Sequence, residues 1–253
     1  MKMRLTLLAA VGCLMLATSC NKPEETTQYA TNKAVERLVE RIDDSSWLTE
    51  DGSTNIHTTY FSYNSDGTLK AIKGYEGDYI FEKKGNTLFM QRNINNNEIE
   101  ESSFDLNEKG WIVLDRSWDG TGNYRLTYDG TGNLHQVFDE DKLLRTFEWK
   151  EGNIVNEEVT YIPTQSNPSN IDWCAFFQSW RRDIQDDENL VDVFSICFFW
   201  GFSEGYLGNK CKGLPLTMNN GRTNYSYDFD QDGFVSTIYV NGDPCYKVSY
   251  LKK

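Results

Sequence analysis

The sequence predicts a mainly β protein, an antiparallel up-and-down meander that curls into an open or closed barrel-like sheet, with a short helical insertion. Two observations lead to this fold class. A turn motif flanked by alternating apolar residues recurs over most of the chain, and one stretch rich in aromatic residues interrupts the series. A composition of 39% hydrophobic and 14% aromatic residues excludes a disordered chain.

Residues 1–19 predict a secretory signal peptide. Lys2 and Arg4 give a positive start, an apolar run covers residues 5–17, and the small residues Thr18 and Ser19 follow. A charged start, a short apolar run and small residues at its end are typical of such signals. The run is shorter than the roughly 20 residues that a membrane-spanning helix needs.

Cys20 directly follows these small residues, and Ala17-Thr18-Ser19-Cys20 resembles the lipobox of bacterial lipoproteins. In that family the signal is removed and the cysteine carries lipid, so the resemblance implies acylation of Cys20. The segment Lys22-Pro23-Glu24-Glu25 resembles the surface-export signal of Bacteroides-type lipoproteins. We therefore expect residues 20–33 to be the lipid-anchor cysteine and a tether. We expect the mature chain to be an outer-membrane lipoprotein, exposed at the cell surface or facing the periplasm.

The acidic charge balance limits the partners. The chain has 25 Lys and Arg against 38 Asp and Glu, a net charge of −13, and removal of residues 1–19 takes away Lys2 and Arg4 to leave −13 − 2 = −15. Nucleic acid is excluded because phosphate binding needs a basic face. Acyl chains hold a protein on a membrane without a basic patch. The partners we expect are the membrane, through the lipid anchor, and a glycan or a protein.

Residues 34–253 predict a single β-rich domain built from a repeated hairpin. Each copy has two apolar residues separated by one position, then a polar turn, commonly opened by Asn or Asp, and then a glycine. Apolar residues at i and i+2 place one face of a strand on a core. The Asn or Asp accepts backbone hydrogen bonds, and the glycine takes a positive φ. The copies are residues 61–69, 104–112, 126–134 and 227–235, with a looser copy at 79–85 and a shortened one at 147–154.

The two ends of this domain carry different signals. Asn241-Gly242 predicts a tight hairpin turn before a final strand over 246–250. Residues 34–42 are ambiguous, because their apolar residues have helical spacing while a first strand is equally consistent with the sequence.

A segment at about 163–223 breaks the hairpin pattern and is the predicted insertion. Asp172 is placed to cap a short helix whose apolar residues follow at i, i+3, i+4 and i+7, namely Trp173, Phe176, Phe177 and Trp180. Residues 190–202 are almost wholly apolar and predict a buried helix or a core strand. We expect the insertion to fill the concave side of the sheet as a lid or plug.

Two resemblances accompany these patterns. The hairpins resemble the YD-type repeats of bacterial surface proteins. The segment 205–215, followed by Tyr225-Ser226-Tyr227 and Asp232-Gly233, is similar, together with the lipobox and the hairpin run, to Bacteroides-type lipoproteins with a domain of unknown function. That family's domain has a porin-like, barrel-like fold, and the resemblance covers roughly residues 35–251. It implies the fold and an envelope location, and it brings no catalytic or binding residues.

Four cysteines remain after the signal peptide and Cys20, and they are candidates for disulfides: Cys174, Cys197, Cys211 and Cys245. Four cysteines in an exported chain can form two bridges in three connectivities. No C-x-x-C spacing occurs, which disfavours a zinc or redox site. Buried free thiols are the alternative. We favour at least one disulfide, in which Cys174 or Cys197 ties the insertion down.

One acidic motif has the form of half a calcium loop. Asp228, Asp230 and Asp232 precede Gly233, but position twelve of the loop is Tyr239 instead of an acid. The same residues form one of the predicted hairpin turns, which is the favoured interpretation. Calcium at these three aspartates is the one cofactor that the sequence leaves open.

No catalytic residue is predicted. The segment 201–205 matches the G-x-S-x-G pattern of serine hydrolases, but no histidine follows Ser203 and no helix-forming stretch comes next. The acidic runs 139–141 and 186–188 leave open a pair of carboxylates for glycan hydrolysis. Tyr75 and Trp118 lie beside turn glycines and are candidates for stacking against a ligand.

The sequence therefore predicts a non-catalytic, lipid-anchored protein of the cell envelope that binds a glycan or a protein. The alternatives are an envelope hydrolase that cleaves glycans with paired carboxylates, and a purely structural envelope component. An exposed aromatic cleft without facing acids favours the binding protein. Two buried carboxylates with raised pKa values in one pocket favour the enzyme.

Overall fold

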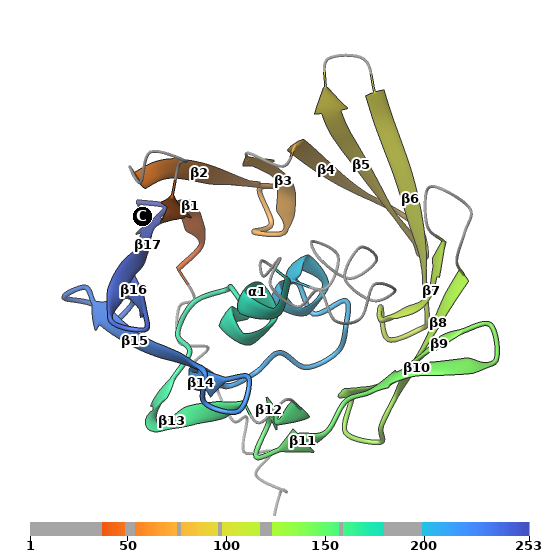
Figure 1. Cartoon of the computed structure of the whole chain (residues 1–253). Coiled ribbons are helices and arrows are strands. Elements are labelled where there is room, and N and C mark those ends of the chain that lie inside the picture. The colour runs from red at the N-terminus through yellow and green to blue at the C-terminus, as the bar shows by residue number, and fades with distance from the viewer. Residues whose placement is uncertain are drawn as a thin grey trace, which may run out of the picture. The chain divides into compact units, whose positions relative to one another are not determined.

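Most of the chain forms one antiparallel sheet, which curls around a short helix (Figure 1). The computed structural model describes residues 37–48, 54–74, 77–95, 98–116, 123–156, 159–179 and 199–252. These belong to one compact unit spanning residues 34–253. The first nine strands are β1 (Val39–Leu48), β2 (Thr54–Tyr63), β3 (Leu69–Gly74), β4 (Gly77–Lys84), β5 (Thr87–Asn95), β6 (Glu98–Leu106), β7 (Ile112–Arg116), β8 (Asn123–Tyr128) and β9 (Leu134–Asp139). The others are β10 (Lys142–Thr146), β11 (Trp149–Lys150), β12 (Asn153–Ile154), β13 (Thr160–Ser166), β14 (Gly213–Met218), β15 (Thr223–Phe229), β16 (Val235–Val240) and β17 (Asp243–Tyr250).

The order of the strands confirms the predicted meander. Fifteen strands pair in the order β10 to β1 and then β17 to β13, so nearly every strand lies beside its neighbour in sequence. The pairing of β1 with β17 joins the first strand to the last. The sheet is not closed, because its edge strands β10 and β13 do not pair. Figure 1 shows the separate two-stranded sheet of β11 and β12 between them. We call this gap the seam.

The hairpin turns have the predicted chemistry. At the turn between β2 and β3, the Asn64 carbonyl accepts a hydrogen bond of 3.0 Å from the Gly67 N–H, and the Asn64 N–H donates to Thr68 O at 2.8 Å. Gly67 has a φ of +86°, which a side chain would strain. The turn from β15 to β16 repeats this arrangement between Asp230 and Gly233. All six repeat copies lie at hairpin connections of the structure.

The ambiguous first segment contains a strand. In β1 the residues Val39 and Ile42 are both buried although a regular strand would turn them to opposite faces. A register shift between Val39 and Arg41 resolves this, because a bulge moves the following side chains to the other face. Pairing with β2 on one side and β17 on the other then satisfies the backbone hydrogen bonds of β1.

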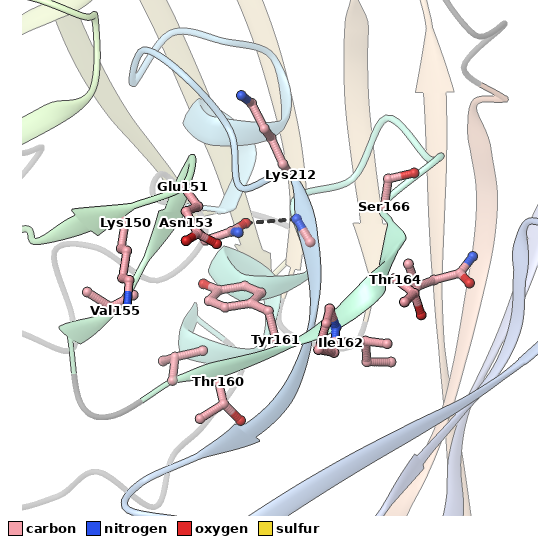
Figure 2. A pocket seen from close by; sticks show the side chains of 14 residues that line it. Lys150, Glu151, Asn153, Val155, Thr160, Tyr161, Ile162, Thr164, Ser166 and Lys212 are labelled. Atoms are coloured by element: carbon pink, nitrogen blue, oxygen red, sulfur yellow. Dashed lines mark hydrogen bonds between the residues drawn. The ribbon is translucent and has the colours of Figure 1, made fainter.

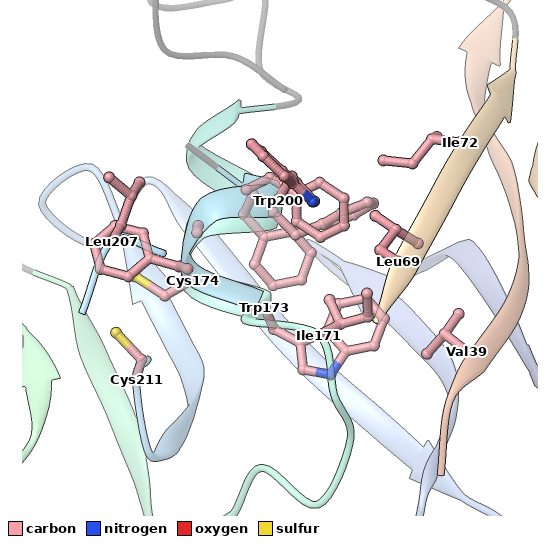
Figure 3. Packing of buried hydrophobic residues seen from close by; sticks show 14 of the residues in the cluster. Val39, Leu69, Ile72, Ile171, Trp173, Cys174, Trp200, Leu207 and Cys211 are labelled. Carbon is pink, nitrogen blue, oxygen red and sulfur yellow. The ribbon is translucent and has the colours of Figure 1, made fainter. Parts of the chain in front are cut away.

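Aromatic side chains of the insertion fill the inner side of the sheet (Figure 3). Asp172 caps α1 (Trp173–Ser179), because its Oδ1 atom accepts a hydrogen bond of 3.0 Å from the Ala175 N–H. Phe177 of this helix stacks on Tyr225 of β15 at 4.1 Å between ring centroids. After the undescribed residues 180–198, a helical turn at 199–203 places Trp200 against Phe81 of β4 at 4.3 Å. The helix after Asp172 and the filling of the concave side both agree with the sequence prediction.

The insertion is shorter than the sequence indicates. Strand β14 and the second half of β13 lie within the expected range 163–223 and belong to the sheet, so the described insertion is limited to residues within 167–212. Pro163 occupies β13, an edge strand, where the missing N–H of proline costs no ladder hydrogen bond. In the parts of the chain that the structure describes, no helix has the length and apolar character to cross a membrane.

Candidate functional site

A pocket at the seam is the candidate functional site (Figure 2). Its volume is about 610 Å³, within the range of sites that bind small ligands. Strand β13 forms one wall, and the β11–β12 hairpin with the residues just before β14 forms the other. We call it the seam pocket. Its lining residues are Lys150, Glu151, Asn153, Val155, Val159, Thr160, Tyr161, Ile162, Pro163, Thr164, Gln165, Ser166, Lys212 and Gly213.

A small set of hydrogen bonds, from both side chains and backbone, holds the second wall together. The Asn153 Oδ1 atom accepts a hydrogen bond of 2.7 Å from the Gly213 N–H, drawn in Figure 2. The Lys212 N–H donates to Gly152 O at 3.1 Å, and the Lys212 side chain lies over Gly152. On the opposite side of the hairpin, the Trp149 indole N–H donates to Leu134 O at 2.8 Å. The β11–β12 hairpin is therefore fastened both to β9 and to the start of β14.

The lining of the seam pocket suits binding through hydrogen bonds. Thr160, Thr164 and Ser166 supply hydroxyl groups, and two lysines supply positive charge. Among the lining residues that the structure describes, Glu151 carries the one carboxylate, and none is a histidine or cysteine. A hydrolytic site of the two-acid type needs a second carboxyl group across the substrate. The hydroxyl and ammonium groups of the described lining suit hydrogen bonding to a polar ligand.

Tyr161 connects the seam pocket to the interior. Its ring lines the pocket, and its hydroxyl donates to Ile154 O at 2.7 Å and lies 3.1 Å from Cys174 Sγ. Burial raises the pKa of the Tyr161 phenol, so this group stays protonated and acts as a hydrogen-bond donor. The Tyr161 hydroxyl is thus fixed by contacts in the interior, while the Tyr161 ring faces the pocket.

Beneath Tyr161 lies a group that we call the thiol cluster, consisting of Asp172, Cys174 and Cys211. One side-chain oxygen and the two sulfurs lie within 4.8 Å of one another, and all three residues are buried. The other oxygen of the Asp172 carboxylate, beyond the one that caps α1, accepts a hydrogen bond of 2.7 Å from the Cys211 N–H. Burial raises the pKa of Asp172, while these backbone hydrogen bonds oppose the rise.

One acidic side chain on the inner face of the sheet has an altered protonation equilibrium. Asp115 of β7 is buried opposite Phe104 of β6 and Tyr124 of β8. Burial raises its pKa to about 7. Two further acids of the sheet are buried: Glu100 forms an ion pair with Arg92 at 3.3 Å, and Asp44 accepts hydrogen bonds from Ser46.

The three aspartates of the calcium motif have other contacts. Asp230 and Asp232 accept hydrogen bonds from the Arg37 guanidinium at 2.7 and 3.2 Å, and Asp228 accepts one from the Tyr239 hydroxyl at 2.6 Å. Among the described residues, these carboxylates do not form a group with oxygens within 4.8 Å. The hairpin turn separates Asp228 from the other two, because Asp228 lies in β15 whereas Asp230 and Asp232 lie in the turn that follows it. The geometry supports the turn interpretation, and calcium binding stays a prediction.

Of the remaining predicted residues, the structure describes some and leaves others out. Cys20, Tyr75, Trp118 and Cys197 lie outside the described residues. The other disulfide candidates are buried free thiols, of which Cys174 and Cys211 come together in the thiol cluster whereas Cys245 lies in β17.

The serine of the G-x-S-x-G segment has a structural contact. The Ser203 hydroxyl accepts a hydrogen bond of 3.1 Å from the Asp172 N–H, at the start of α1. Both histidines of the chain, His57 and His135, lie in strands β2 and β9 instead of beside this serine. The acidic run 139–141 forms the turn between β9 and β10.

Sequence reasoning missed the seam pocket. Its two walls join Asn153 to Gly213, which are 60 positions apart in the chain. A local signal was nevertheless present, because β13 carries polar residues at neighbouring positions (Thr164, Gln165, Ser166) where a half-buried strand would alternate.

Comparison with solved structures supports the fold. A porin-like protein from Bacteroides uniformis ATCC 8492 is similar with a TM-score of 0.56 at 15% sequence identity, over 84% of this chain and 98% of that chain. A porin-like protein from Bacteroides vulgatus ATCC 8482 aligns with a TM-score of 0.26 at 11% identity, over 86% of this chain and 100% of that chain. Neither a protein-family model nor a curated protein matches the sequence. The first likeness shows a shared porin-like β fold, in agreement with the fold that the sequence predicts.

Proposed function

We propose that this chain is a lipid-anchored protein of the cell envelope that binds a glycan or a protein partner, without catalysis, in the seam pocket. The observation that carries the binding role is the seam pocket itself. Its described lining combines hydroxyl, amide and ammonium groups with the Tyr161 ring and the Glu151 carboxylate. Sugars and polar peptide segments are recognised by such a mixture of hydrogen-bonding groups and an aromatic surface.

The envelope location depends on the N-terminal sequence. A lipobox-like segment ending at Cys20 and an export-like segment at 22–25 support acylation and transport to the outer membrane. The fold shared with a porin-like protein is consistent with such a location. The sorting signal favours display at the cell surface, and a periplasm-facing orientation is the alternative.

The anchor is tested by fractionating cells that express the full chain or Cys20→Ser. The unchanged chain is expected in the detergent-soluble membrane fraction, with a mass increase on its N-terminal peptide that fits acyl groups. Cys20→Ser is expected to lose both. An unmodified N-terminal peptide in the unchanged chain would overturn the anchor. Antibody labelling of intact cells distinguishes the two orientations.

The binding role is tested with the purified full chain in mild detergent, on a glycan array and in pull-down from envelope extracts. A retained glycan or protein is expected, and its release should follow substitution of the pocket residue Thr164 by Arg. Ser62→Arg is the matched control, because Ser62 is equally exposed but lies on β2, outside the pocket lining. Cleavage of a retained glycan would support the hydrolase alternative. No retained ligand at high micromolar concentration would favour the structural role.

A further inference from the structure

The sulfur atoms of the thiol cluster belong to two different elements of the insertion. Cys174 lies in α1, and Cys211 lies just before β14, 37 positions later. Their sulfurs lie within 4.8 Å of each other and face one another in Figure 3. Rotation of the two side chains with a small backbone shift can close a separation of this size to a covalent bond.

The groups around the two sulfurs act mainly as donors towards them. The Gln178 side-chain amide donates to Cys174 Sγ at 3.3 Å, and the Ile154 N–H donates to Cys211 Sγ at 3.4 Å. The Tyr161 hydroxyl lies within hydrogen-bonding distance of both sulfurs. A disulfide has no S–H hydrogen, yet its sulfurs still accept weak hydrogen bonds. The same surroundings therefore suit the oxidised pair.

We propose that Cys174 and Cys211 form a disulfide in the exported chain, and that this bond fastens α1 to the base of β14 beneath the seam pocket. The proposal rests on the export part of the proposed function, because disulfides persist in oxidising compartments. The bond would close a loop that includes the undescribed residues 180–198. It would also fix the two sulfurs against which the Tyr161 hydroxyl packs. Because the Tyr161 ring lines the seam pocket, the bond would thereby fix this part of the pocket wall.

The chemistry needs an external disulfide as the oxidant. One cysteine thiolate attacks a sulfur of the oxidant, which forms a mixed disulfide and releases one oxidant thiolate. The second cysteine then attacks the sulfur of the first and releases the other oxidant thiolate. In sum, the two cysteines lose two protons and two electrons, and the oxidant is reduced to two thiols.

The bond forms during folding. Both cysteines are buried in the folded chain, where an external disulfide does not reach them. Burial also raises the pKa of the Cys211 thiol well above its usual range, which removes the reactive thiolate. The same protonation disfavours a metal ion, since metals bind the thiolate. Moreover, both oxygens of Asp172 already accept backbone hydrogen bonds.

The test is non-reducing peptide mapping of the full chain after expression with its own signal sequence. Cells are lysed in N-ethylmaleimide, and the protein is purified in detergent and digested. We expect a peptide pair that joins Cys174 to Cys211, with a mass two hydrogens below the sum of the two, and an alkylated Cys245. Alkylation of both Cys174 and Cys211, or a bridge from either to Cys197, would overturn the proposal. One equivalent of bound zinc, measured by mass spectrometry of the metal, would also overturn it.

A second experiment separates this proposal from a failure of export. The denatured, reduced full chain is refolded in a mixture of reduced and oxidised glutathione and mapped in the same way, with the same bridge expected. Dithiothreitol should then raise the unfolding equilibrium constant about 10²-fold in the unchanged chain. It should have no such effect on a Cys174→Ser/Cys211→Ser variant, whereas Cys245→Ser should respond like the unchanged chain. A chain that refolds without the bridge would contradict the proposal whatever its cellular location.

Discussion

The side chain of Asn153 and the backbone of Gly213 meet at the seam, where the Asn153 Oδ1 atom accepts a hydrogen bond of 2.7 Å from the Gly213 N–H. This contact joins the two-stranded sheet to β14 of the large sheet. Strands β10 and β13 do not pair, so the seam is held by this contact together with the backbone hydrogen bond from the Lys212 N–H to Gly152 O.

Substitution of Asn153 by Ala should weaken the seam. It leaves the partly buried Gly213 N–H without its acceptor, and an unsatisfied buried donor costs about 1–3 kcal/mol. The free energy of unfolding, measured in urea, should fall by that amount. Asn64→Ala is the control, because its side-chain amide makes only an exposed hydrogen bond to Thr68, and its effect should stay within about 0.5 kcal/mol. Equal effects of the two variants would contradict the role of Asn153.

Gly213 should tolerate no side chain. A Cβ atom there would lie 3.0 and 3.2 Å from two atoms of Tyr161 and 3.4 Å from Asn153 Oδ1. Gly213→Ala must therefore displace the tyrosine that walls the seam pocket, at a cost of about 1–3 kcal/mol in unfolding free energy. Gly130→Ala is the matched control, since nothing lies within 4 Å of its Cβ position. Chemical denaturation of both variants checks this, and an unchanged stability of Gly213→Ala would refute the tight packing.

The aromatic packing between the insertion and the sheet should dominate stability. Phe177 is almost fully buried and stacks on Tyr225 at 4.1 Å, so Phe177→Ala removes a large buried side chain and leaves a cavity. Such substitutions cost about 3–5 kcal/mol. Phe229→Ala, on β15 and 37% exposed, should cost far less. Thermal unfolding of the two variants measures the difference, and similar losses would show that the insertion adds little to the fold.

Asp115 should make stability depend on pH. Its pKa is about 7 when folded and near 3.8 when unfolded, because burial penalises the charged carboxylate. Between these values the folded state binds more protons than the unfolded state, so stability falls as pH rises from about 4 to about 7. The total loss is on the order of 4 kcal/mol.

Urea unfolding of the unchanged chain and Asp115→Asn from pH 4 to pH 8 tests this dependence. The variant should lose the decline and become the more stable of the two above pH 7. Arg116→Gln serves as the control, because Arg116 is the exposed neighbour of Asp115 and pairs with Asp105 on the outer face. A parallel pH dependence in the unchanged chain and Asp115→Asn would contradict the raised pKa.

The local features of the fold could be predicted from the sequence, and the long-range ones could not. The turn at Asn64 and Gly67 depends on residues a few positions apart, and so does the cap of α1 by Asp172. The pairing of β1 with β17 is a contact between the two ends of the domain. No local pattern distinguishes it from other pairings of alternating strands, so closure of the barrel could not be decided from the sequence.

The candidate site could not be predicted from the sequence either, because it also depends on contacts between residues far apart in the chain. Asn153 and Gly213 meet only because the insertion returns the chain to the seam, and the same return brings Cys211 to Cys174. The sequence identified both cysteines as disulfide candidates but could not choose their partners, since spacing alone leaves three connectivities. At Asp228, Asp230 and Asp232 a calcium-like spacing coincides with a hairpin turn, and Asp230 and Asp232 accept hydrogen bonds from Arg37.

Recognition of a partner in the seam pocket is the central claim, and a quantitative binding curve tests it most directly. The partner retained by the full chain would be titrated against the unchanged protein, Thr164→Arg, Lys212→Ala and Ser62→Arg, with circular dichroism to confirm that all four are folded. We predict at least tenfold weaker binding for Thr164→Arg, a smaller loss for Lys212→Ala and no change for Ser62→Arg. Equal dissociation constants for Thr164→Arg and Ser62→Arg would contradict the claim that this pocket is the binding site.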